Sequence, residues 1–183
     1  MAFVVALVVL VGVICLLDLI LTVGVIRRLK VHAELLSKMP SGVVTTPEPM
    51  LGSGEVAEPF EATTTDGEAV SRELLSGNTL VGFFSPSCSA CHERLPEFVS
   101  HAADFPGGRG QVLAVVVGSD EAARPQREQL EPAARVVVEP EQGRIATALR
   151  VQAFPVFAVL DSSGKVLVSG FQLDQVRMAT AGV

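Results

Sequence analysis

The feature that most constrains the fold of this chain is a short apolar run that leads directly into a C-x-x-C pair. Residues 80–84 contain no polar side chain, and turn-forming residues lie on both sides of them. A run of this length between turns is typical of a strand that is buried on both faces. A turn of two serines around a proline follows. Beyond it, apolar residues recur at helical spacing, and Cys91 falls on the same face of the expected helix. The sequence therefore predicts a buried strand, a tight turn and a helix that starts at Cys88.

The placement of the two thiols favours redox chemistry. At the start of a helix, free backbone N–H groups and the positive end of the helix dipole stabilise a thiolate. Cys91 follows Cys88 by three residues, so it lies one turn deeper and within reach of a disulfide bond. We therefore expect Cys88 to attack a substrate disulfide and Cys91 to resolve the mixed disulfide.

Strand and helix signals alternate along the rest of the chain. Strands are expected at residues 60–65, 68–70, 112–118, 136–138, 156–160 and 166–170. Beyond the helix at the cysteines, helices are expected at residues 121–130, where Pro125 should break the helix, and at residues 144–151. This alternation predicts an α/β fold with helices on both faces of one sheet.

The N-terminus is apolar over residues 2–26 except for Asp18, Thr22 and two glycines. A helix of that length spans the hydrocarbon core of a bilayer, which is about 30 Å thick. A cleaved signal peptide fits less well, because the run is long and no Lys or Arg precedes it. The expected organisation is a transmembrane anchor at 1–26, a juxtamembrane helix and flexible linker at 27–57, and a folded domain at 58–183.

The motifs around the cysteines resemble those of the thioredoxin superfamily, and within it the TlpA-like group. The matching residues are Cys88-Ser89-Ala90-Cys91, then Pro96, and Phe154-Pro155 directly before a strand. The anchor layout is similar to that of the methylamine-utilisation protein MauD. This resemblance implies a thioredoxin-like fold with a central mixed sheet. It also implies that Pro155 is a cis residue facing the cysteines, and that Phe154 and Pro155 shape the substrate-binding groove.

The resemblance further implies an enzyme, a thiol–disulfide oxidoreductase that acts on protein cysteines without a cofactor. It implies a single-pass protein of a bacterial cell membrane, with the domain outside the cytoplasm and a possible electron-transfer partner in the membrane. The charges indicate the opposite orientation, because Arg27, Arg28, Lys30 and Lys38 all follow the anchor. The orientation therefore stays open at this point.

Two positions depart from the pattern of the group. Ser87 replaces the aromatic residue that usually precedes the first cysteine, and Arg94 stands where many TlpA-like members carry a Glu. Glu93 is a weak candidate for the general base, since a solvated helix face explains it as well. The base that deprotonates the second thiol is therefore not assigned.

Composition and motif spacing limit the other functions. The net charge of −6 and the lack of a basic patch argue against a nucleic-acid partner. His32 and His101 have no convincing partner ligands, so no metal site is expected.

Three alternatives to thiol–disulfide exchange remain. The chain could be a tethered module that binds a partner without turnover. It could reduce peroxides, although Val81 and Ser85 occupy the positions of Pro and Thr in the peroxidatic motif. Cys88 to His92 also satisfies C-x-x-C-H, the attachment signature of c-type haem, with Met178 as a second ligand.

Overall fold

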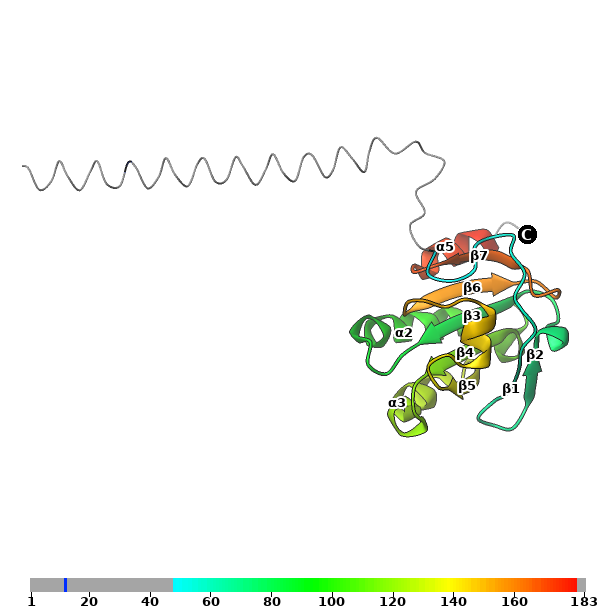
Figure 1. Ribbon diagram of the computed structural model, residues 1–183, viewed down its shortest axis with the longest axis horizontal. Coiled ribbons are helices and arrows are strands. Elements are labelled where there is room, and N and C mark those ends of the chain that lie inside the picture. Colours follow the sequence, from blue (N-terminus) through cyan, green and yellow to red (C-terminus); the bar gives the residue numbers. More distant parts are fainter. Residues whose placement is uncertain (1–11, 13–47, 181–183) are drawn as a thin grey trace, which may run out of the picture. The chain divides into compact units, whose positions relative to one another are not determined.

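The computed structural model describes residue 12 and residues 48–180, and the fold below is that of the second range (Figure 1). The expected anchor at 1–26, apart from residue 12, and most of the expected linker at 27–57 lie outside the described residues. None of the helices within the described ranges is long and apolar enough to cross a membrane.

A five-stranded mixed sheet forms the centre of the domain (Figure 1). Its strand order is β5-β4-β3-β6-β7, with β3, β4 and β5 parallel, β6 antiparallel to β3, and β7 antiparallel to β6. These strands are β3 (Thr79–Phe84), β4 (Val112–Val117), β5 (Arg135–Glu139), β6 (Val156–Leu160) and β7 (Val166–Gly170). The run before the cysteines is thus the central strand, as its apolar sequence predicted.

A smaller antiparallel pair lies outside this sheet. It consists of β1 (Glu61–Thr63) and β2 (Ala69–Ser71), which pair around the turn predicted at residues 66–67. Two short 3-10 helices complete the connections, η1 (Arg72–Leu74) after β2 and η2 (Gly108–Gln111) before β4.

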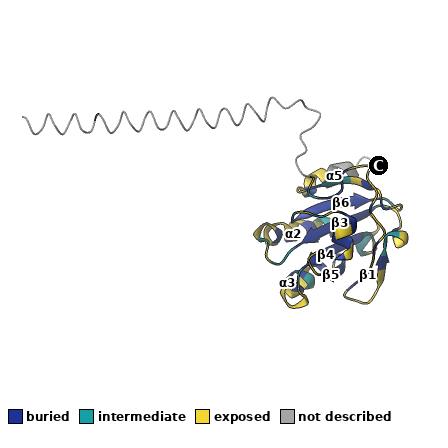
Figure 2. Cartoon of the chain, in the orientation of Figure 1, coloured by how far each residue is buried: buried dark blue, intermediate teal, exposed yellow. Residues whose placement is uncertain are grey.

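Both faces of the main sheet are covered, which explains why its central strands are apolar throughout. Leu80 and Phe84 share a core with α2 (Ser89–Ala103), α3 (Asp120–Leu130) and α5 (Leu173–Thr180). Val81 and Phe83 point to the other face, which α4 (Arg144–Ala148) and the chain between Met50 and Leu75 cover. Figure 2 shows this arrangement, with the buried strands between helices that are exposed on their outer sides.

The packed domain starts earlier than the predicted boundary between residues 57 and 58. Met50 and Leu51 are each only 2% exposed and belong to the core on the α4 side. The N–H of Leu51 donates to the carbonyl of Leu149 over 2.9 Å. The predicted linker therefore includes residues that belong to the domain.

Two helix predictions differ from the structure, and one further helix was missed. The helix expected to break at Pro125 instead runs unbroken from Asp120 to Leu130. Pro125 is the sixth of the eleven helical residues, and its missing N–H removes a single helical hydrogen bond. The helix expected to reach residue 151 ends at Ala148, because Arg150 adopts φ 51° and closes it. Helix α5 was not predicted at all.

The helix α2 packs unusually close to β3, because Gly82 has no side chain. A Cβ atom at Gly82 would lie 2.6 Å from Cε2 of Phe98. The Phe98 ring has no room to move aside, since it stacks on Phe157 at 5.7 Å and meets Phe84 edge-on at 5.1 Å. The absence of a side chain at Gly82 therefore sets how near the cysteine helix lies to the central strand.

We expect Gly82→Ala to lower the free energy of unfolding by about 1–3 kcal/mol, the usual cost of forcing an extra methyl group into a packed core. Equilibrium denaturation with urea measures it. Gly110→Ala is the matched control, because a Cβ at Gly110 meets nothing within 4 Å. Equal stability of the two variants would contradict the packing argument.

Candidate active site

Cys88 lies at the start of α2, where the sequence predicted it. It is the N-cap residue, with extended backbone angles of φ −95° and ψ 112°. Its sulfur accepts the N–H of Cys91 over 3.3 Å, and its own N–H donates to the carbonyl of Ser85 over 3.1 Å. The side chain is half-buried and carries a free thiol. A backbone donor of the helix N-terminus is thus directed at a sulfur that a substrate can reach.

Cys91 lies behind Cys88 and has no exposed surface. The N–H of Ser85 donates to its sulfur over 3.4 Å. Burial and the neighbouring Cys88, opposed by the Ser85 N–H, together raise the pKa of the Cys91 thiol to about 12. Cys91 therefore holds its proton at neutral pH, and the two thiols differ in accessibility as the sequence predicted.

The segment before β6 faces the cysteines. The Phe154-Pro155 peptide bond is cis, which confirms the conformation that the family resemblance implied. The Cys88 thiol donates to the carbonyl oxygen of Phe154 over 3.4 Å. Pro155 is buried and Phe154 is half-buried. The structure thus brings Phe154 to Cys88, whereas the part that Phe154 and Pro155 play in substrate binding stays a prediction.

A cleft of about 440 Å³ opens beside the cysteines. Ser85 and Phe154 line it, and both are bonded to a cysteine. The remaining lining residues come mainly from the end of β4 and from the segment around α4: Val117, Glu141, Gln142, Ala146, Thr147, Arg150, Val151 and Gln152. Its floor is therefore partly apolar, and its rim carries one acidic and one basic side chain.

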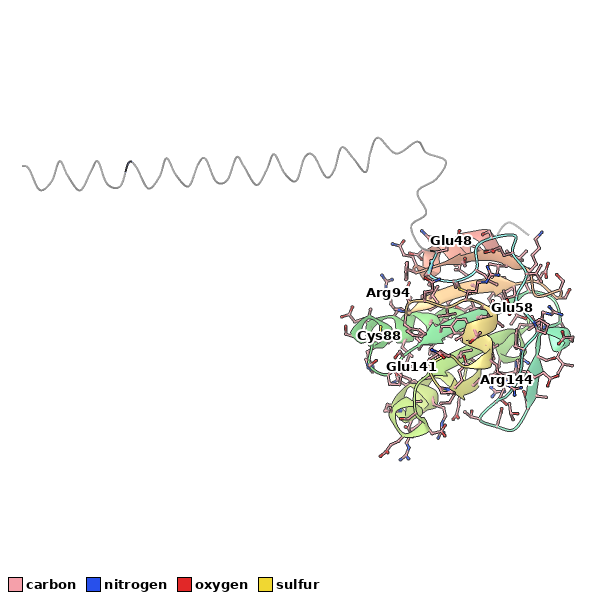
Figure 3. All side chains as sticks on the ribbon, in the orientation of Figure 1. Glu48, Glu58, Cys88, Arg94, Glu141 and Arg144 are labelled. Atoms are coloured by element: carbon pink, nitrogen blue, oxygen red, sulfur yellow. The ribbon has the colours of Figure 1, made fainter. Side chains whose placement is uncertain are left out.

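A larger cleft of about 580 Å³ lies elsewhere, between α4 and the segment that includes Glu58. No residue that bonds to either cysteine lines it. Figure 3 shows its lining residues Glu58 and Arg144 well apart from Cys88, whereas Glu141 lies on the loop that borders the smaller cleft. Proximity to the reactive thiols, rather than size, makes the smaller cleft the candidate substrate site.

Gln126 is a residue of the site that the sequence analysis missed. It is 1% exposed, and its Nε2 donates to the carbonyl of Ser85 over 3.2 Å. It lies on the helix predicted at residues 121–130, for which no buried face was identified. The signal was present, since Ala123, Gln126 and Leu130 recur at helical spacing and all three are buried.

The charged residues near the cysteines in sequence do not join the site. Glu93 is exposed, and Arg94 is exposed and pairs with Glu97 over 3.2 Å. Within residues 48–180 neither makes a hydrogen bond to a cysteine, so Glu93 gains no support as the general base. Across the described residues, no group of three His, Cys, Asp or Glu side chains is placed to hold a metal ion.

The geometry does not suit an attached haem. Both sulfurs of a C-x-x-C-H motif must reach the haem to form thioether bonds, but Cys91 is wholly buried in the core. The exposed ring of His92 is engaged instead by the carbonyl of Pro86, at 3.1 Å from Nε2. The side chain of Met178 lies outside the described set.

Comparison with solved structures identifies the fold. The thioredoxin domain of a thiol-disulfide oxidoreductase from Bacteroides vulgatus matches with a TM-score of 0.59 and 19% identity, over 72% of this chain and 97% of that one. A domain of a putative thiol-disulfide oxidoreductase from Bacteroides thetaiotaomicron matches with a TM-score of 0.59 and 12% identity, over 72% and 95%. A secreted disulfide oxidoreductase of Mycobacterium tuberculosis matches with a TM-score of 0.54 and 18% identity, over 68% and 96%. The expected thioredoxin-like α/β fold with a central mixed sheet is confirmed.

Sequence comparison identifies the family. No curated protein matches the chain. A family model does match, over residues 53–169, and this range includes both cysteines and the Phe154-Pro155 segment. Because the match covers more than half of the 183 residues, this chain belongs to the AhpC/TSA family.

Proposed function

We propose that this protein is a thiol–disulfide oxidoreductase that exchanges disulfides with cysteines of other proteins through Cys88 and Cys91. One observation carries the proposal. The reachable Cys88 sulfur receives a hydrogen bond from the N–H of Cys91, while the Cys91 sulfur is buried directly behind it. One thiol is thus placed to react with a substrate, and the other is protected until the first has reacted.

The reaction has two steps that balance in atoms and electrons. The Cys88 thiolate attacks a substrate disulfide, which forms a mixed disulfide and releases one substrate thiolate. Cys91 then loses its proton and attacks the Cys88 sulfur, which releases the second substrate thiolate and leaves a Cys88–Cys91 disulfide. Two electrons have passed to the substrate, so a reductant must return the pair to the dithiol. We propose that the protein reduces or matures exported proteins.

The substrate polypeptide is proposed to bind along Phe154, Pro155 and the 440 Å³ cleft. The carbonyl of Phe154 already contacts the Cys88 thiol, so a chain bound along this segment brings its own sulfur close to Cys88. The partly apolar floor allows the flanking side chains of a substrate to be buried.

We further propose the TlpA-like, membrane-tethered arrangement for this chain. Residues 1–26 would form a single anchor in a bacterial cell membrane, and the domain would lie outside the cytoplasm. The length of the apolar run and the motifs around the cysteines support this proposal, while the basic residues after the run oppose the orientation. A membrane protein that supplies electrons is the reductant that such a location requires.

Peroxide reduction is the weaker alternative. A peroxidatic thiol needs a nearby hydroxyl that orients the peroxide, and Ser85 occupies that position in the sequence. The Ser85 hydroxyl lies 3.1 Å from the hydroxyl of Ser87 instead. Within the described residues, the partners of the Cys88 sulfur are the Cys91 N–H, the Phe154 carbonyl and the neighbouring Cys91 thiol, and no hydroxyl is among them.

Trapping tests the proposed reaction directly. In Cys91→Ser the second step cannot occur, so we expect a substrate protein to accumulate as a mixed disulfide at Cys88. Non-reducing electrophoresis and mass spectrometry measure the adduct, which reductant should release. The double variant Cys88→Ser with Cys91→Ser is the control. A partner that binds equally well to all forms, without any adduct, would support the non-catalytic module instead.

Alkylation tests the different roles of the two thiols. In the reduced protein at about pH 8, we expect iodoacetamide to modify Cys88 and spare Cys91. With a pKa of about 12, only about one Cys91 in ten thousand is ionised at that pH. Labelling of Cys91 should rise as the pH approaches about 12, or when denaturant exposes the core. Peptide mapping measures both sites, and equal labelling at pH 8 would contradict the assignment.

Filling the cleft tests the proposed substrate groove. Gln152 lines the cleft with an exposed side chain, and within residues 48–180 only its backbone N–H is bonded, to the carbonyl of Pro49 at 2.8 Å. We expect Gln152→Trp to slow exchange with a protein disulfide by about tenfold, the effect of losing about 1.4 kcal/mol of binding.

The same variant should react normally with a small aromatic disulfide, which reaches Cys88 without using the cleft. Gln129→Trp is the matched control, because Gln129 is exposed on α3 and lies outside the cleft. If Gln152→Trp and Gln129→Trp behave alike with the protein substrate, the cleft does not bind it.

A further inference from the structure

We propose that Gln126 is a positioning residue for the second step, because its side chain holds the Ser85 peptide against the Cys91 sulfur. The inference rests on the exchange reaction proposed above and concerns only the step in which Cys91 acts.

The Ser85 peptide is the junction between the two cysteines and α3. Its carbonyl accepts both the N–H of Cys88, over 3.1 Å, and Nε2 of Gln126, over 3.2 Å. Its N–H donates to the Cys91 sulfur over 3.4 Å. The amide orientation of Gln126 follows from this contact, since a carbonyl oxygen can only accept. Within residues 48–180, Gln126 is the one side chain from outside the cysteine segment that bonds to this peptide, and it comes from a helix that follows the cysteines by one strand.

The fold does not need an amide at this position. Gln126 is 1% exposed and shares the buried stripe of α3 with Ala123 and Leu130. Its Oε1 is buried and accepts no hydrogen bond from any residue in the range that the structure describes. A buried amide with one unmatched end costs stability, and an apolar side chain of similar size avoids that cost. The requirement for the amide therefore lies in the reaction.

The second step explains this requirement. Cys91 must become a thiolate to attack the mixed disulfide, yet its burial opposes the charge. The Ser85 N–H is the group that lowers the pKa of Cys91, and Cys88 is the titratable group acting on it. During resolution Cys88 is bonded to the substrate, so the Ser85 N–H remains as the donor to the forming thiolate. A side chain that fixes the Ser85 peptide thus controls the rate of resolution.

The test separates the two steps with an aromatic disulfide that releases a coloured thiolate. Attack by Cys88 releases the first equivalent, and resolution by Cys91 releases the second, so stopped-flow absorbance follows each step. The full-length chain in detergent carries Cys15→Ser, so that only the pair reacts. We expect Gln126→Met to slow the second phase by about tenfold, the effect of losing one hydrogen bond that supports a charged group. The first phase should change by less than about twofold, within the scatter of such effects.

Gln129→Met is the matched control, because Gln129 lies on the same helix, is exposed and bonds only to the carbonyl of Pro125. Equal second phases in Gln126→Met and Gln129→Met would overturn the inference and leave the proposed function intact. A wild-type chain that releases no second equivalent would instead contradict the proposed function, and with it this role of Gln126.

Gln126→Glu keeps the test decisive if the Met variant does not fold. A protonated carboxyl can donate to the Ser85 carbonyl, whereas an ionised one cannot. The second-phase rate of this variant, divided by that of the wild type, should therefore fall as the pH rises and the carboxyl ionises. A ratio that is independent of pH would overturn the inference.

Discussion

Three aromatic rings hold the reactive segments of this protein together. Phe84 ends the central strand just before the cysteine turn, Phe98 lies on the cysteine helix, and Phe157 follows Pro155 by two residues on β6. Their centroids lie 5.1 to 5.9 Å apart in edge-on and stacked pairs. Such pairs add about 0.5–1.5 kcal/mol each beyond the area they bury. The strand, the helix and the cis-proline segment therefore meet because one aromatic cluster, seated on Gly82, ties them to a common core.

The same burial that stabilises the core creates the chemical difference between the thiols. Cys91 points from α2 into the aromatic side of the sheet and is packed as a small apolar residue, so its ionisation is opposed. Cys88, at the helix start, packs against the edge of that core and is only half-buried. Burial of Cys91 stabilises the core but opposes the ionisation that its reaction requires. The N–H of Ser85 donates to the sulfur and partly offsets this opposition.

The parts of the site that follow from local pattern could be predicted from the sequence. The apolar run before Cys88 identified the central strand, and the spacing of the two cysteines identified their order on the helix. The cis bond at Phe154-Pro155 was implied by the family resemblance alone. Contacts between distant segments could not be predicted in this way. The bond from Gln126 to Ser85 joins residues 41 positions apart, and nothing near Gln126 in the sequence indicates its partner. The burial of Met50 could not be predicted for the same reason, because only tertiary packing distinguishes its segment from a linker.

The α4 side of the cleft beside the cysteines is held by contacts of its own. Glu139, 6% exposed at the end of β5, accepts the N–H groups of Ile145 and Ala146 over 3.0 and 2.8 Å and so fixes the start of α4. Burial raises the pKa of its carboxyl, and these two bonds oppose the rise. On either side of α4, Gln142 and Arg150 adopt φ values of 67° and 51°, which are costly for residues with side chains, and both line the cleft. Neither residue belongs to the aromatic cluster, so in the proposed function this wall can change in sequence while the geometry of the two thiols is preserved.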